Sequence, residues 1–409
     1  MERMKIVIVG HVDHGKSTLI GRLFYDTDSL PESKLKEIKE VCEALGKDIE
    51  FGFVLDHLEE ERKQGITIDT TQTFFRTNKR EYAIIDAPGH VEFIKNMITG
   101  ASQAEAAILI VDVTEGVEEQ TKRHAFLLSL LGIKQIIVVI NKMDLVDYDE
   151  SNFLRVKEEI LSFLKEIKLT PRFIIPISAK EGDFVAHKTS KMNWYKGPTV
   201  LEALDKFDVR ENLSSKPLRF CVQDVYNFDK RVVVGKVLSG VINKDDEIRI
   251  LPSSKKTVVL SLEEFNRQPT KAIAGKSTGI TTRDKLFIDR GDIIVKEGEI
   301  QPRVTSSFYG RIFWLSRAPY KLGERITFKC STQEVGCAMD IIRVIDSSTL
   351  SVKENKETIE ENDVADVIIK TDKEVVLDKF EFIPPLGRFV LQREDVVAGG
   401  IIINTGDEE

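Results

Sequence analysis

The sequence predicts an α/β domain with a mostly parallel, doubly wound sheet, followed by two small antiparallel β-barrels. Before residue 210, apolar runs of strand length are followed by polar loops, and a helix is expected from Thr18 onward, as in open α/β sheets. Near residues 210–217 this pattern gives way to short alternating strands separated by turn residues, which is typical of small closed barrels. A chain of 409 residues is also too long for one ordinary core and indicates two or three domains.

Turn residues mark the expected domain boundaries. We expect domains at 1–210, 217–299 and 302–409, with the first boundary in the stretch RENLSSKP. The expected strands of the first barrel are Leu218–Val222, Val232–Leu238, Glu247–Leu251 and Thr257–Leu260. Those of the second barrel include Arg311–Leu315, Arg325–Lys329 and Phe389–Leu391.

A phosphate-binding loop is predicted directly after the first apolar run, Ile6–Val9. The stretch GHVDHGKS fits G-x-x-x-x-G-K-[ST], in which a glycine at each end lets the backbone N–H groups point at phosphates. Lys16 would reach the outer phosphates, Ser17 would coordinate Mg²⁺, and the following helix would present its positive end to the anion. The expected binding residues are Gly10, His11, Val12, Asp13, His14, Gly15, Lys16, Ser17 and Thr18.

Two further loops predict that the nucleotide is GTP or GDP. Asn141, Lys142 and Asp144 follow the buried run 136–140, so they lie at the carboxyl end of a strand, where open α/β sheets bind ligands. Asp144 can accept hydrogen bonds from the ring N–H and the amine of guanine, a pair that adenine lacks. Ser178, Ala179 and Lys180 follow the run 173–177 and offer a backbone N–H to the guanine carbonyl oxygen.

The terminal phosphate has two expected sensors. Asp86 and Gly89 follow the run 82–85 and would place a carboxylate near the metal and an N–H near that phosphate. Thr67 lies in the stretch GITID and would complete the Mg²⁺ shell only while the third phosphate is present. The alternation over 66–71 also predicts an edge strand, and we expect both features.

These motifs together resemble those of the translation-factor class of GTPases. The resemblance is carried by GHVDHGKS, GITID, DAPGH and NKMD. It implies that His90 orients the attacking water and that Val12 and Ile66 are apolar gate residues. The expected catalytic residues are therefore His90, Lys16, Thr67 and Gly89, and the expected Mg²⁺ ligands are Ser17, Thr67 and Asp86.

A GTPase domain with two barrels is the architecture of elongation factor Tu and its relatives, and it serves more than one task. The stretches DLVDY, PLRFCVQDVY, DRGD and IFWLSRAP resemble the GTPase large subunit of sulfate adenylyltransferase. This resemblance implies a subunit that couples GTP hydrolysis to adenylylsulfate formation beside an ATP-pyrophosphatase-type small subunit. The alternative is an elongation factor Tu-like GTPase that delivers aminoacyl-tRNA to the ribosome, and PPLGRF at 384–389 is equally similar to the elongation factors.

Composition adds several expectations. The net charge of −8 argues against a broad nucleic-acid-binding surface. No apolar run approaches ~18 residues and the start has no apolar signal segment, so we expect a cytoplasmic protein without membrane contact. Four cysteines without C-x-x-C pairs indicate reduced thiols and no structural metal. We expect core or inter-domain positions for the aromatic residues Phe308, Tyr309, Phe313, Trp314 and Tyr320.

Overall fold

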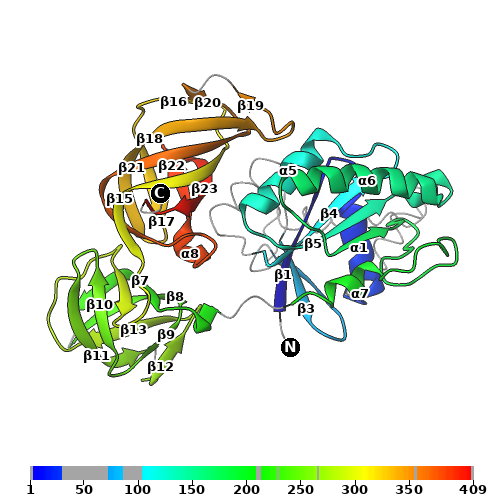
Figure 1. Ribbon diagram of the computed structural model, residues 1–409. Helices are drawn as coiled ribbons and strands as arrows, with labels where there is room; N and C mark the ends of the chain where they lie inside the picture. Colours follow the sequence, from blue (N-terminus) through cyan, green and yellow to red (C-terminus); the bar gives the residue numbers. More distant parts are fainter. Residues whose placement is uncertain are drawn as a thin grey trace, which may run out of the picture. The chain divides into compact units, whose positions relative to one another are not determined.

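A computed structural model describes residues 3–29, 72–85, 104–208, 213–227, 230–264, 267–353 and 357–406. The chain divides into two compact units, Met1–Val209 and Arg210–Glu409. The first unit contains a six-stranded sheet with the order β2-β3-β1-β4-β5-β6, in which only β2 runs antiparallel to its neighbour (Figure 1). The strands are β1 (Arg3–Gly10), β2 (Gln72–Arg76), β3 (Glu81–Ile85), β4 (Ala106–Asp112), β5 (Gln135–Asn141) and β6 (Phe173–Pro176).

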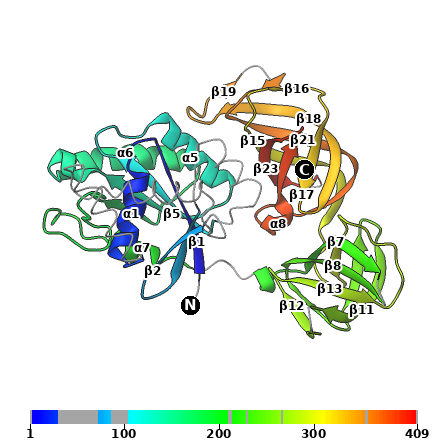
Figure 2. The ribbon, with the colours of Figure 1, turned by 180° about the vertical axis from the view of Figure 1, so that it is seen from behind.

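Helices cover both faces of this sheet. α5 (Glu119–Leu130) and α6 (Glu150–Glu166) lie on the face turned toward the reader in Figure 1, and α1 (Lys16–Asp26) lies on the face seen in Figure 2. The described part of this unit also contains the shorter η1 (Met143–Val146) and α7 (Val200–Leu204). All seven residues of β4 are buried, as expected for a strand covered on both sides. The predicted doubly wound α/β domain is confirmed.

The strand order decides where a ligand can bind. β1 pairs with β3 on one side and with β4 on the other, so the sheet grows in opposite directions from β1. Helices cross over on opposite faces at such a point and leave a crevice at the carboxyl ends of the strands. The loops that follow β1, β4, β5 and β6 all lie at this edge.

The second unit begins with a closed barrel of order β10-β11-β13-β8-β7-β14, in which β14 pairs back onto β10. Its inward side chains form a hydrophobic core that includes Phe220, Val233, Ile248 and Ile294. A separate two-stranded sheet is made by β9 and β12. The elements are η2 (Leu213–Ser215), β7 (Arg219–Asn227), β8 (Arg231–Ser239), β9 (Val241–Asn243), β10 (Glu247–Leu251), β11 (Lys255–Glu263), β12 (Lys271–Ile273), β13 (Ser277–Thr282) and β14 (Ile293–Lys296).

A second barrel follows, with the order β17-β22-β23-β15-β21-β18-β19 and a β17–β18 pairing that closes it. β16 and β20 form a small separate sheet. The elements are β15 (Arg303–Trp314), β16 (Tyr320–Lys321), β17 (Ile326–Cys330), β18 (Gln333–Asp346), β19 (Val352–Lys353), β20 (Thr358–Ile359), β21 (Asp363–Leu377), α8 (Pro384–Gly387), β22 (Arg388–Gln392) and β23 (Val396–Asn404). The predicted pair of antiparallel barrels is thus confirmed.

The aromatic residues of the second barrel differ in their exposure. Phe308, Phe313, Trp314 and Tyr320 are buried, as expected for core residues. Tyr309 is 42% exposed, because alternation along β15 turns it to the opposite face from Phe308.

The described cysteines, Cys221, Cys330 and Cys337, are buried and free, and Cys42 lies outside the described residues. In the described part of the chain, no helix combines the length and the apolar character needed to cross a bilayer. The same part contains no group of three or more His, Cys, Asp or Glu side chains placed to hold a metal ion.

Candidate nucleotide site

The predicted phosphate loop connects β1 to α1 at the carboxyl edge of the sheet. Gly15 has a φ of +93°, and a Cβ there would lie 2.3 Å from the amide nitrogen of Asn141. A Cβ on Gly10 would lie 2.4 Å from the carbonyl oxygen of Ile110 on β4. Both glycines of the motif are therefore required by close approach to neighbouring strands and loops as well as by backbone conformation.

Lys16 lies inside the curve of this loop. Its Nζ donates hydrogen bonds to the carbonyl oxygens of Gly10 at 3.0 Å and His11 at 2.6 Å. Burial lowers the pKa of Lys16, and the nearby Asp13 carboxylate opposes that effect. α1 begins at Lys16 and has no acidic residue in its first turn, so no carboxylate of this helix competes for its N-terminal N–H groups. The loop and helix end together suit an anionic ligand.

The predicted base-binding residues converge through Asn141, which ends β5. Its Nδ2 donates to the carbonyl oxygen of His14 at 2.9 Å, and its Oδ1 accepts from the N–H of Ala179 at 2.9 Å. Asn141 is buried, and both its amide atoms are used within the protein. Asn141 therefore joins the phosphate loop to the 178–180 loop, and its expected role in binding the nucleotide stays a prediction.

Asp144 is oriented from the same side. Ser178 Oγ donates a hydrogen bond of 2.6 Å to Asp144 Oδ1. The N–H of Met143 also donates to the carbonyl oxygen of Ile177 at 3.1 Å, which ties the two loops together by their backbones. Lys180 and Leu145 are both exposed beside these residues. A carboxylate fixed in this way is suited to recognise a pair of N–H donors.

Asp112, which the sequence analysis did not single out, is ion-paired with Lys142, with 2.6 Å between Oδ2 and Nζ. Glu115 accepts at 3.0 Å from His14, and Gln120 accepts from the N–H of Val12 at 3.2 Å. The signal that points to Asp112 is positional: it is an acidic residue at the carboxyl end of a fully apolar run, at the same edge as the recognised motifs.

Several predicted site residues lie outside the described residues: Ile66, Thr67, Asp86, Gly89 and His90. Of the expected Mg²⁺ ligands, the structure therefore places only Ser17, which is exposed at the start of α1. A hydroxyl at this position is compatible with a hard cation that prefers oxygen ligands.

Comparison with known families identifies the class of protein. The elongation factor Tu GTP binding domain family matches residues 1–209. The chain belongs to the elongation factor Tu family of GTPases. Members of this family bind GTP and GDP with Mg²⁺ and hydrolyse GTP, which confirms the expected cofactors and GTPase class. The elongation factor Tu domain 2 family matches residues 230–295, and the GTP-eEF1A C-terminal domain-like family matches residues 307–403.

Similar curated proteins extend over the whole chain. The elongation factor 1-alpha of Methanopyrus kandleri is 41% identical over 427 residues, covering 100% of this chain and 99% of that protein. The protein of the same name from Thermococcus onnurineus is 41% identical, covering 98% of this chain and 97% of its own length. That from Archaeoglobus fulgidus is 39% identical, covering 98% of each chain.

The expectation of a sulfate adenylyltransferase subunit is therefore wrong, and so is its expected partner, an ATP-pyrophosphatase-type small subunit. The three relatives above, each similar to this elongation factor Tu family member over nearly its whole length, are named elongation factor 1-alpha. The structure also explains why short stretches such as IFWLSRAP and DRGD did not identify the correct family member. Trp314 of IFWLSRAP is buried and donates to the carbonyl oxygen of Ala318, and Asp292 of DRGD caps its own turn by accepting from the N–H of Asp289. These residues serve barrel packing and turns, so they carry little information about a partner.

Proposed function

We propose that this chain is a translation GTPase that carries aminoacyl-tRNA to the ribosome in its GTP-bound state. The observation that carries the proposal is the 41% identity to elongation factor 1-alpha over 100% of the chain. The hydrogen bond from Ser178 to Asp144 supports it, since it orients a carboxylate toward guanine recognition. The proposed partners are aminoacyl-tRNA and the ribosome.

The proposal assigns roles to predicted site residues from each motif. The glycine loop and Lys16 bind and neutralise the phosphates, while Asp144 and the 178–180 loop select guanine. Mg²⁺ would be held by Ser17, Thr67 and Asp86 and would offset the negative charge that develops on the phosphates. Gly89 would sense the third phosphate, and His90 would orient the attacking water. The proposed domains remain 1–210, 217–299 and 302–409.

Protection of the aminoacyl ester tests this function. The purified chain, at low micromolar concentration, is mixed with aminoacyl-tRNA and either GTP or GDP, and hydrolysis of the ester is followed with time. We expect slower hydrolysis with GTP than with GDP, because the third phosphate orders the binding-competent state. Equal hydrolysis with GTP, GDP and no protein would contradict tRNA delivery but would leave the GTPase class unchanged.

A further inference from the structure

A short segment at the end of β4 contacts both halves of the candidate nucleotide site. We call residues Asp112, Val113, Thr114 and Glu115 the β4 strap. None of them belongs to the phosphate loop, the NKMD motif or the 178–180 loop. The strap begins where β4 ends, at the sheet edge that carries all three.

The first arm of the strap reaches the base side. The Asp112 side chain is fully buried, and its Oδ2 lies 2.6 Å from Lys142 Nζ. Its Oδ1 accepts from both the N–H and the hydroxyl of Thr114, each at 2.7 Å. Burial raises the pKa of Asp112, but hydrogen bonds from Lys142 and Thr114 outweigh burial and keep the pKa below its ordinary value. The buried carboxylate thus stays ionised and holds the ammonium of Lys142.

This ion pair acts at a turn. Lys142 has a φ of +64° and immediately precedes η1, which carries Asp144. The strap also pairs with the end of β5, where the N–H of Val113 donates to the carbonyl oxygen of Asn141 at 3.0 Å. A residue with positive φ persists when its surroundings hold it there. The ion pair with Asp112 restrains the side chain of Lys142 in this way.

The second arm reaches the phosphate side. His14 Nδ1 lies 3.2 Å from the backbone N–H of Asp112 and 3.5 Å from the carbonyl oxygen of Ile110, and the shorter contact makes this ring nitrogen an acceptor. The ring proton is therefore on Nε2, which donates to Glu115 Oε2 at 3.0 Å. The His14 side chain is fully buried, and its carbonyl oxygen accepts from Asn141. The strap thus fixes both the tautomer and the orientation of a phosphate-loop residue.

The outer side of the strap is itself supported by α6. Arg155 Nη2 donates to the carbonyl oxygen of Val113 at 2.9 Å. The strap then turns at Gly116, whose φ is +79° and whose N–H donates to the carbonyl oxygen of Asp112 at 2.9 Å. A Cβ on Gly116 would lie 2.9 Å from Glu159 Oε2, so the turn sits close against α6. The strap is thus a supported segment rather than a loose loop.

We propose that Asp112 and Glu115 are positioning residues of the nucleotide site, Asp112 acting through Lys142 and Glu115 acting through His14. The inference rests on the guanine-nucleotide site proposed above. Neither residue contacts the reacting atoms in this assignment. Together they hold the base-binding and phosphate-binding loops in the relative position that a nucleotide requires. The loops therefore lose less conformational entropy when the nucleotide binds.

Nucleotide dissociation tests the proposal. Release of a fluorescent GDP analogue from the full chain is measured by stopped flow for the wild type, Asp112→Asn and Glu115→Gln. We expect each variant to release GDP about tenfold faster, since each loses one charge-assisted contact. Single-turnover hydrolysis at saturating GTP is expected to change by less than about twofold, because a positioning residue for binding acts before the chemical step.

A matched control and a double-mutant cycle separate positioning from general weakening. Glu119→Gln makes the same acid-to-amide change on α5, where Glu119 is 61% exposed and pairs with Arg123. It should leave GDP release unchanged. If Asp112 acts through Lys142, then Lys142→Met alone and the Asp112→Asn/Lys142→Met double variant should release GDP at the same rate. The same equality is expected for His14→Ala with and without Glu115→Gln.

The outcomes distinguish a failure of the positioning role from a failure of the proposed function. Wild-type rates of GDP release in both single variants, or additive effects in both cycles, would overturn the positioning role while leaving the nucleotide site intact. A wild-type chain that binds no guanine nucleotide would instead overturn the proposed function. If Asp112→Asn does not fold, Glu115→Gln carries the same test, because the Glu115 side chain is 45% exposed and its loss leaves no buried charge.

Discussion

Arg219 and Asp378 form a buried, bidentate ion pair that joins the two β-barrels. Arg219 Nε lies 2.8 Å from Asp378 Oδ2, and Nη2 lies 3.2 Å from Oδ1. Nη1 and Nη2 also donate to the carbonyl oxygens of Leu218 and Ile300, respectively, each at 3.0 Å. Arg219 belongs to β7 of the first barrel, and Asp378 follows β21 of the second. The barrels are also continuous by packing, since Cys221 and Ile293 of the first share a core cluster with Phe308 of the second.

Removing one partner of this pair should destabilise the second unit strongly. Asp378→Ala leaves the Arg219 guanidinium buried without its counter-ion, which typically costs about 3–5 kcal/mol. The free energy of unfolding, measured by urea denaturation, checks this. An Arg219→Met/Asp378→Leu double variant should recover much of the loss, because no buried charge remains.

An exposed pair provides the control. Arg325 and Asp372 are ion-paired, with side chains 60% and 46% exposed. Asp372→Ala should cost much less unfolding free energy than Asp378→Ala, because solvent screens the exposed pair. If Asp378→Ala and Asp372→Ala lowered the free energy of unfolding equally, burial would not be the reason why the inter-barrel pair stabilises the protein.

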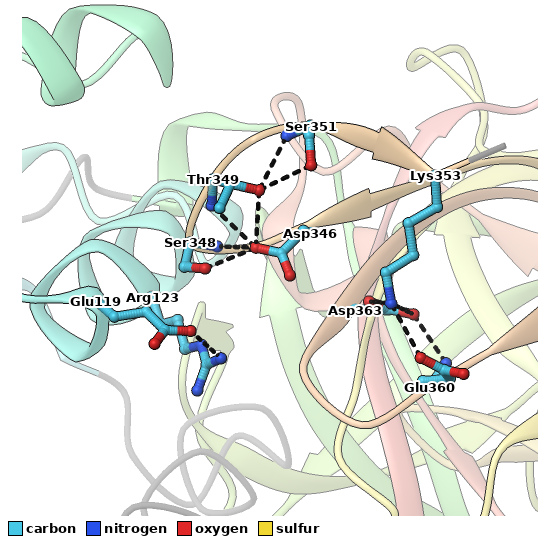
Figure 3. A network of polar contacts seen from close by, with 9 residues as sticks. All are labelled: Glu119, Arg123, Asp346, Ser348, Thr349, Ser351, Lys353, Glu360 and Asp363. Carbon is cyan, nitrogen blue, oxygen red and sulfur yellow. Dashed lines mark hydrogen bonds and ion pairs between the residues drawn. The ribbon is translucent and has the colours of Figure 1, made fainter.

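A second prediction concerns acid stability at the turn after β18. Asp346 Oδ1 accepts hydrogen bonds from Ser348 N–H and Oγ and from Thr349 N–H and Oγ1 (Figure 3). Burial alone would raise the pKa of Asp346, but these hydrogen bonds outweigh it and lower the pKa to about 2. Its folded pKa is thus below its unfolded value, so its stabilisation is present above about pH 4 and is lost as the pH falls toward 2.

In the Asp346→Asn variant, the free energy of unfolding should therefore depend less on pH in the acid range than in the wild type. The difference in unfolding free energy between the wild type and this variant should shrink as the pH falls from 5 to about 2. Thr349→Val, which removes one of the donors, should have a smaller effect in the same direction. Thermal unfolding of each protein across this pH range is the measurement, and a difference that stays constant with pH would contradict the assigned cause.

The base preference gives a third prediction. Asp144→Asn should shift binding from guanine to xanthine nucleotides, because the 2-oxo group of xanthine accepts from the new amide donor. Losing the paired contact to guanine should cost on the order of 2–4 kcal/mol. Titrations with GDP and with xanthosine diphosphate check this. Ser178→Ala, which removes the hydrogen bond that orients Asp144, should weaken GDP binding without this change in preference.

A fourth prediction concerns hydrolysis. His90→Ala should slow single-turnover GTP hydrolysis by about 10²-fold or more with little change in GTP affinity, since in the proposed role the imidazole orients water and does not hold the nucleotide. Thr67→Ala should also reduce the Mg²⁺ dependence of GTP binding, because its hydroxyl belongs to the proposed metal shell. Unchanged hydrolysis in His90→Ala would remove His90 from the mechanism.

Much of the fold and of the candidate site was predictable from local sequence. Apolar runs marked β1, β3, β5 and β6, and the loops after them carry motifs whose chemistry depends on residues close together in the chain. Gly10, Gly15 and Lys16 lie within seven positions, and their geometry follows from one tight turn. The closed barrels were predictable as a class because alternating strands at short spacing have few other ways to bury one face.

Other features depended on contacts between distant positions. His14 and Glu115 are 101 residues apart, and Arg219 and Asp378 are 159 apart. No local pattern predicts that these residues pair with each other. The strand order decided which loops meet at one edge of the sheet. The packing of the two barrels decided that Arg219 is buried away from solvent. The sequence by itself determined the strands, the loops and the nucleotide chemistry of their motifs; only the tertiary structure decided which distant charges are buried together, because burial depends on elements brought from elsewhere in the chain.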